Sequence, residues 1–370
     1  MFIGRTVAWQ RGVELFTIAG LPVTSSFVLD GMAFSLSLLG FLTVHEFGHY
    51  FAARHHRVRT SLPYYIPSPL IGIGTLGAVI RIRERIPATR VLFDIGAAGP
   101  LAGFVVALGL LLYAMATIPP PEYMFDVGGH EALRQHIEQT GQFPGTMLPG
   151  PEGIEGARII VGNTALYWFL SQFFADLPPM YEMYHYPVLF AAWLGLFFTA
   201  LNLMPVGQLD GGHILYALFG RAWHGRLARV FMLLMLLSMT IGMADDGPQL
   251  LAGFFPWLAM RPLLLEVLAW MLLGAFLFLL VRRIVTGWQY LPIGAVMLLL
   301  AALSRVAIQG LAEFGYSGWA LWCILLIFFV RMDHPPVVNP APLSRSRRML
   351  GILSLVIFVL CFSIRPLYIV

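Results

Sequence analysis

The sequence predicts an all-α polytopic membrane protein with about eight transmembrane helices and one small β element. Its composition is the first reason. Of 370 residues, 58% are hydrophobic and 11% are charged, and the mean hydropathy is +0.78, whereas soluble domains carry about 25% charged residues. The second reason is a series of apolar runs close to the length of about 20 residues that crosses a bilayer. The runs lie near residues 28–53, 92–117, 186–206, 227–244, 263–281, 291–309, 318–331 and 349–363.

The basic residues, all of which are arginine, give the third reason. They gather in short connections between the apolar runs, at 54–59, 81–90, 221–229, 282–283 and 331–348. One topology places all of these connections in the cytoplasm, as the positive-inside rule requires. The acidic connection 118–182 is then predicted to face outward. This distribution explains the pI of about 9.2 without a nucleic-acid partner.

The order of the segments predicts three parts. Residues 1–27 are an interfacial or re-entrant segment, 28–220 a transmembrane core, and 221–370 additional transmembrane helices. Within the core, the segment 60–90 is too polar and too rich in glycine and proline to span. It ends in "GAVIRIRERI", where apolar and charged residues alternate with the period of a half-buried strand. A short β-hairpin or strand is therefore expected near 75–85.

The stretch "HEFGH" at 45–49 places ionisable residues inside the first apolar run. His45 and His49 are four residues apart, so on a helix both rings project from one face. Two imidazoles in this arrangement can bind one zinc ion, and Glu46 can reach a metal-bound water as general base. The alternative is a pair of polar residues packed at a helix end. Ionisable groups within a span are costly and mark functional sites, so the metal site is favoured.

A catalytic zinc usually takes three protein ligands, and "LNLMPVGQLDGG" at 201–212 offers a third. Here a proline and a glycine break the helix after a long apolar run, and broken helices at membrane depth line cavities. Asp210 in this break, with Asn202 before it, is typical of a site. Asp210 could equally be an ordinary cap on the helix that follows, and the residue pattern alone does not decide between the two.

Other polar or small residues receive simpler interpretations. His55 and His56 lie among arginines and indicate the membrane boundary. His213 is assigned to a supporting role beside the metal or to the helix surface. The "DHPP" stretch at 333–336 has no assigned chemistry. Gly99 and Gly103 are predicted to let two helices approach closely.

Both motifs together resemble the site-2 protease family of intramembrane zinc metalloproteases. Its two signatures, HExxH and N-x-x-P-x-x-x-x-D-G, are matched in residue type and spacing by "HEFGH" at 45–49 and "NLMPVGQLDG" at 202–211. The resemblance continues through "PYYIPSP", "GTLGAVIRIRERIP", "FDIGAAGPLAGF" and "DHPPV". It covers residue 12 to the C-terminus and is closest to the bacterial, archaeal and plastid branch without an inserted PDZ module.

The resemblance implies a role for each matching residue. His45, His49 and Asp210 would bind one zinc ion per chain, while Glu46 would activate the water and Asn202 would hold the water or the oxyanion. Gly74, Thr75, Gly77 and Val79 fall in the family's substrate-facing β element. The expected activity is cleavage of membrane-anchored proteins within or beside their transmembrane segments.

Two other functions use the same residues. A catalytically silent scaffold would bind membrane segments without cleaving them, and a metal-ion transporter would use His and Asp ligands along a path. The intact set of four polar residues disfavours the scaffold. The apparent lack of further polar residues across the other spans disfavours the transporter. The N-terminus shows no transit-like pattern, so a bacterial inner membrane is the expected location. The sequence does not indicate an oligomeric state.

Overall fold

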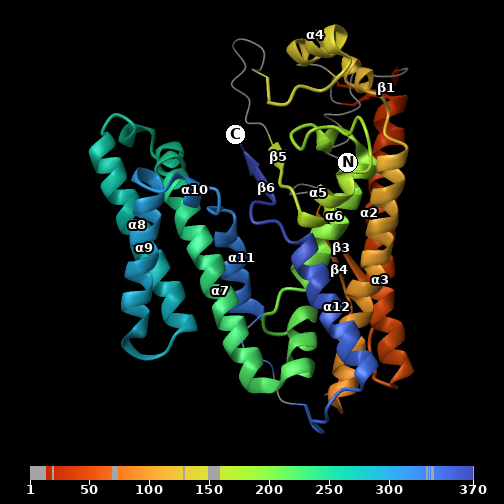
Figure 1. Ribbon diagram of the computed structural model, residues 1–370, viewed down its shortest axis with the longest axis vertical. Coiled ribbons are helices and arrows are strands. Elements are labelled where there is room, and N and C mark those ends of the chain that lie inside the picture. Colours follow the sequence, from red (N-terminus) through yellow and green to blue (C-terminus); the bar gives the residue numbers. More distant parts are fainter. Residues whose placement is uncertain are drawn as a thin grey trace. The chain divides into compact units, whose positions relative to one another are not determined.

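In the computed structural model the chain is mostly helical (Figure 1). The structure describes residues 14–18, 21–68, 74–84, 86–127, 130–148, 159–330, 332, 334 and 337–369. The chain divides into two compact units. Unit 1 combines Met1–Leu203 with Val337–Val370, and unit 2 is Met204–Pro336.

Four helices form the core of unit 1. They are α2 (Ser25–His55), α3 (Thr89–Ala116), α6 (Pro187–Asn202) and α12 (Arg345–Cys361). The central helix is α6, which contacts the other three and is buried along most of its length. Its Trp193 is fully buried and donates its indole N–H to the Gly162 carbonyl at 3.0 Å. A buried indole is stable only when its N–H has such a partner.

Small residues bring α2 and α3 together. A Cβ atom on Gly48 would lie 2.6 Å from the Ala98 carbonyl oxygen, so only glycine allows this approach. Gly99 and Gly103 on α3 face the two histidines of α2 in the same way. The prediction that these glycines serve close helix packing is confirmed.

The described residues of unit 1 also form three antiparallel strand pairs. β1 (Glu14–Ile18) pairs with β2 (Leu21–Thr24), and β5 (Ile159–Val161) pairs with β6 (Leu367–Ile369). β3 (Tyr64–Ser68) pairs with β4 (Gly74–Val79). This third pair confirms a small β-hairpin in this region. Its strand β4 ends at Val79, so most of the alternating stretch 77–86, from which the strand was predicted, lies beyond it. Residues 1–13 of the predicted N-terminal segment lie outside the described residues.

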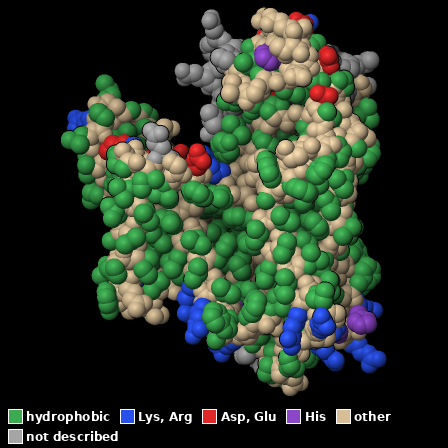
Figure 2. Space-filling model, in the orientation of Figure 1, with side chains coloured by type: hydrophobic (Ala, Val, Ile, Leu, Met, Phe, Trp, Pro, Cys, Tyr) green, Lys and Arg blue, Asp and Glu red, His purple; other side chains and the backbone are tan. Residues whose placement is uncertain are grey.

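In its described residues, the connection between α3 and α6 contains β5 and further short elements. These are η1 (Pro121–Asp126), α4 (Glu131–Thr140), α5 (Ala165–Ser171) and η2 (Met183–His185). Figure 2 shows arginine side chains gathered at the end of unit 1 opposite α4. This separation of charge agrees with the predicted cytoplasmic and outward faces of unit 1.

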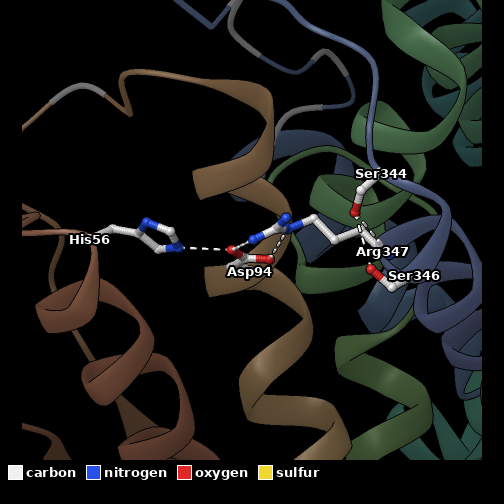
Figure 3. A network of polar contacts seen from close by, with 5 residues as sticks. All are labelled: His56, Asp94, Ser344, Ser346 and Arg347. Carbon is white, nitrogen blue, oxygen red and sulfur yellow. Dashed lines mark hydrogen bonds and ion pairs between the residues drawn. The ribbon is translucent and has the colours of Figure 1, made fainter.

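A polar network joins three segments at the arginine-rich end of unit 1 (Figure 3). The Arg347 guanidinium donates two hydrogen bonds to the Asp94 carboxylate, at 2.7 and 2.8 Å. His56 lies 2.8 Å from the same carboxylate. The Ser344 hydroxyl caps α12 by accepting from the Arg347 backbone N–H. Such bidentate pairs are directional, and this one ties α12 to α3.

Unit 2 consists mainly of helices. They are α7 (Asp210–Phe254), η3 (Pro256–Leu258), α8 (Pro262–Ile284), η4 (Gly287–Gln289), α9 (Tyr290–Val306), α10 (Gln309–Ala312), α11 (Trp319–Leu325) and η5 (Leu326–Val330). Helix α7 is broken at Gly220, whose φ of 76° lies in the left-handed region that glycine adopts without steric cost. Gly242 packs against the Tyr316–Ser317 backbone, where no Cβ would fit.

The predicted number of eight spans is not confirmed. Among the described residues, five helices are long and apolar enough to cross a membrane. They are Val28–His55, Thr89–Ala116, Asp210–Phe254, Pro262–Ile284 and Gly287–Val306. The runs at 186–206 and 318–331 form shorter apolar helices, and the run at 349–363 lies in the 17-residue α12. The chain is thus built for a membrane, with fewer full-length spans than the apolar runs indicate.

Candidate active site

Helix α2 carries the HExxH motif inside unit 1. His45, Glu46 and His49 are 2%, 7% and 6% exposed, so all three polar side chains are withdrawn from the surface. Both rings project from one face of the helix, and their Nε2 atoms lie 3.1 Å apart. Burying such groups is costly without a partner that repays their lost hydration. Two converging imidazole nitrogens can provide two positions of a tetrahedral metal site.

The contact of His49 Nδ1 determines which nitrogen of this ring can bind a metal ion. Its Nδ1 lies 2.7 Å from the Ile95 carbonyl oxygen. A carbonyl only accepts hydrogen bonds, so Nδ1 carries the proton and Nε2 presents its lone pair. This is the arrangement in which a histidine ligates a metal while a backbone oxygen orients the ring.

Two glycines of α3 leave room beside the histidines. A Cβ on Gly99 would lie 2.1 Å from His49 Nε2, and one on Gly103 would lie 3.1 Å from His45 Nδ1. Any larger residue at position 99 would occupy the space next to the proposed ligand atom. Two features therefore fit a bound zinc ion: the buried imidazole nitrogens of His45 and His49, and the absence of a side chain at Gly99 beside them.

The end of α6 brings Asn202 to this group. Its amide Nδ2 lies 3.4 Å from His45 Nε2, although the two residues are 157 positions apart. An amide here can interact with a ligand or reacting group at the histidine pair. The structure therefore joins His45, Glu46, His49 and Asn202 within unit 1.

Asp210 belongs to unit 2, where it is the first residue of α7. The N-cap position is held by Leu209, whose carbonyl accepts from the His213 backbone N–H at 2.9 Å. The alternative interpretation, in which Asp210 is the N-cap of this helix, therefore does not hold. The turn before it folds back closely, since a Cβ on Gly212 would lie 2.3 Å from the Gly207 carbonyl oxygen. The role of Asp210 as third ligand stays a prediction.

The predicted substrate strand lies near α2. The hydroxyl groups of Thr43 and Tyr65 are 2.7 Å apart. This contact holds β3 against α2 at a position two residues before His45. Among the described residues β4 pairs only with β3, so its other edge has no strand partner. Val79 on β4 is 48% exposed.

Two predicted substrate residues shape β4 internally. The Thr75 hydroxyl lies 3.1 Å from the Ile66 carbonyl oxygen and accepts a hydrogen bond from the Gly77 N–H at 3.0 Å. Gly77 has φ of 104°, which only glycine adopts readily. The Gly77 N–H is therefore engaged within the strand. Gly74 begins β4, and substrate contact by these residues stays a prediction.

Three histidines outside the motif, His56, His213 and His334, make polar contacts of their own. His56 pairs with Asp94, in keeping with its predicted place among boundary charges. His213 Nδ1 lies 2.8 Å from His334 Nε2 within unit 2, and the Tyr216 ring lies 4.4 Å from the His334 ring. The contact of His334 with His213 could not be predicted from the sequence, because 121 residues separate the two. Positions 333, 335 and 336 of "DHPP" lie outside the described residues.

The family model of Peptidase family M50 matches residues 33–244. This match covers more than half of the chain and includes both motifs. The chain belongs to peptidase family M50. This is the site-2 protease family, and the resemblance found in the sequence is confirmed.

Several plant proteins are similar to the chain over about half its length. "Probable zinc metalloprotease EGY1, chloroplastic" of Arabidopsis thaliana is 29% identical over 195 residues, which are 53% of this chain and 31% of that protein. "Probable zinc metalloprotease EGY2, chloroplastic" of Oryza sativa subsp. indica is 32% identical over 199 residues, 54% of this chain and 31% of that protein. The chain thus matches less than a third of the length of each relative. No solved structure matches the chain significantly.

Proposed function

We propose that this chain is a zinc-dependent endopeptidase that cleaves membrane-anchored proteins within or beside their transmembrane segments. The observation that carries the proposal is the buried His45–Glu46–His49 group on an apolar helix in a member of peptidase family M50. The chain would bind one zinc ion at this centre, with His45, His49 and Asp210 as protein ligands. The names of the relatives as zinc metalloproteases support this choice of metal.

Each residue of the centre has a chemical task. When bound, zinc would lower the pKa of a coordinated water to about 7 and polarise the scissile carbonyl. The Glu46 carboxylate accepts the proton of the attacking water and delivers it to the leaving amide nitrogen. The Asn202 amide donates a hydrogen bond to the oxygen that becomes negative in the transition state.

The substrate must present an extended peptide, because the backbone groups of a helix are hydrogen-bonded to each other. We propose that the edge of β4 that has no strand partner among the described residues pairs with an unwound substrate segment. The anchor between Thr43 and Tyr65 supports this role, since it holds the hairpin beside the helix that carries the motif. Gly74, Thr75, Gly77 and Val79 then belong to the substrate-binding strand.

The proposed setting is a lipid bilayer, since the described helices include five candidate spans. The proposal of a bacterial inner membrane rests on the sequence. The plant relatives are named as chloroplast proteins. The chemistry is the same in either membrane.

The decisive experiment compares the wild type with Glu46→Gln. Both proteins are purified in full length, their zinc content is measured, and their cleavage of a membrane-anchored reporter is followed in liposomes. We expect Glu46→Gln to keep its zinc and to lose about 100-fold or more in cleavage rate. Glu138→Gln is the matched control, because Glu138 is an exposed residue of α4 paired only with the exposed Arg134 among the described residues.

Unchanged cleavage by Glu46→Gln would overturn the proposal. Retained zinc together with no cleavage by the wild type of any tested reporter would favour the silent scaffold. Zinc flux into sealed vesicles, unaffected by Glu46→Gln, would favour the transporter.

A further inference from the structure

A second group of metal-ligating side chains lies in unit 1, in the connection between α3 and α6. It consists of His130, which precedes α4, together with Glu182 and His185 around η2. One ligand atom from each of the three lies within 4.8 Å of the others. The group is separate in sequence from the HExxH motif and from Asp210, and the proposed protease does not use it.

Burial makes this group unusual for a connection between helices. Glu182 is 7% exposed and His185 is 2% exposed. Among the described residues, Glu182 Oε2 and both ring nitrogens of His185 are buried without a hydrogen-bond partner. A buried carboxylate oxygen and a buried imidazole without hydrogen bonds carry a large desolvation cost. A ligand bound by these atoms would offset that cost.

The distances in the group match metal ligands better than an ion pair. His130 Nε2 lies 3.2 Å and His185 Nε2 lies 3.4 Å from Glu182 Oε2. Charge-assisted hydrogen bonds between nitrogen and carboxylate are shorter, about 2.7–2.9 Å. Ligand atoms around a tetrahedral zinc ion, with bonds of about 2.0–2.1 Å, lie about 3.3 Å apart. All three atoms could therefore face one ion with little movement.

The two histidines of the group lie in direct contact. The His130 and His185 rings meet edge to face with their centres 4.9 Å apart.

We propose that His130, Glu182 and His185 form a second zinc-binding site, beyond the zinc of the proposed catalytic centre. Two imidazoles and one carboxylate are a ligand set suited to zinc, with one position left for water or another ligand.

The site would fasten the connection to the membrane helices. His130 and Glu182 lie 52 positions apart, so an ion held by both closes a long loop, and loop closure by a metal stabilises most when the loop is long. His185 is followed directly by α6, which begins at Pro187 and ends at Asn202. The ion would thus anchor the beginning of the helix that presents Asn202 to His45.

Metal analysis of the purified full-length protein in detergent tests the proposal. We expect about two zinc ions per chain in the wild type. His45→Ala/His49→Ala should keep about one ion, Glu182→Gln/His185→Asn should also keep about one, and the combination should keep about none. Glu138→Gln on α4 is the matched control for a lost carboxylate in the same connection, and it should keep about two ions.

A cobalt titration tests the second site in a protein where that site is intact, so the result does not depend on whether the Glu182→Gln/His185→Asn protein folds. It uses His45→Ala/His49→Ala, in which the second site is unaltered. A d–d absorption spectrum that saturates at about one Co²⁺ per chain supports the proposal. Loss of all bound zinc and absence of this spectrum in His45→Ala/His49→Ala would overturn it. If His45→Ala/His49→Ala instead keeps every ion of the wild type, the proposed catalytic centre fails while the second site stands.

Discussion

Replacing Gly99 by alanine gives the sharpest test of how the helix pair builds the metal centre. The new Cβ would lie 2.1 Å from Nε2 and 2.4 Å from Cδ2 of the His49 ring. Both distances are at least 1 Å below the 3.4 Å at which ordinary contact begins. The ring cannot yield freely, because its Nδ1–H is bound to the Ile95 carbonyl and the site is buried.

The size of the effect follows from this clash. Overpacking by one methyl group in a tight interior costs about 1–3 kcal/mol, and about 1.4 kcal/mol corresponds to a tenfold change in an equilibrium constant. Displacing His49 should therefore weaken zinc binding about 10- to 100-fold, the range found when support of a metal ligand is lost. The assay is zinc competition against a chelator of known affinity, combined with reporter cleavage.

Gly109→Ala is the matched control for this prediction. Gly109 lies on the same helix, and a Cβ added there would meet nothing within 4 Å. It should bind zinc and cleave as the wild type does. Wild-type zinc affinity in Gly99→Ala would refute the inference that the space beside His49 Nε2 belongs to the metal centre.

Three further predictions address the strand, the polar network and the metal. The double substitution Val79→Pro/Ile82→Pro should reduce reporter turnover at least about tenfold without changing zinc content; normal turnover would argue against strand pairing with the substrate. Asp94→Asn should lower stability by about 1 kcal/mol at low salt and by less at high salt, because the pair with Arg347 is only partly buried and is screened; equal melting temperatures of the two proteins at low salt would contradict this. Chelation with 1,10-phenanthroline should abolish cleavage, and added Zn²⁺ but not Mg²⁺ should restore it; full activity in the chelated protein would count against a metal-dependent reaction.

Local patterns predicted the parts of the fold that depend on near neighbours. The four-residue spacing of His45 and His49 predicted their shared helix face. The alternation at 77–86 predicted a strand in the right region, although β4 covers only its first residues. The break before Asp210 followed from a proline and a glycine. In each case the determining residues lie within a few positions of each other, so secondary-structure periods are enough to detect them.

The features that the sequence did not reveal depend on distant segments or on helix length. Asp94 and Arg347 are 253 positions apart, and no periodicity links them. His130 and Glu182 lie in an irregular connection without a recognisable motif. The predicted number of eight spans was not confirmed, because an apolar run does not fix where a helix ends. The run at 186–206 illustrates this, since its helix stops at Asn202 after 16 residues.

The contact between Thr43 and Tyr65 has a consequence for where a bound chain would be cut. A substrate strand paired with β4 would advance about 3.3 Å per residue. A shift of its register by one residue would turn every side chain to the opposite face. Favourable alignments therefore recur every second residue. Because the hairpin is fastened to the helix that bears His45, Glu46 and His49, alternative cleavage points in one substrate should be spaced by even numbers of residues.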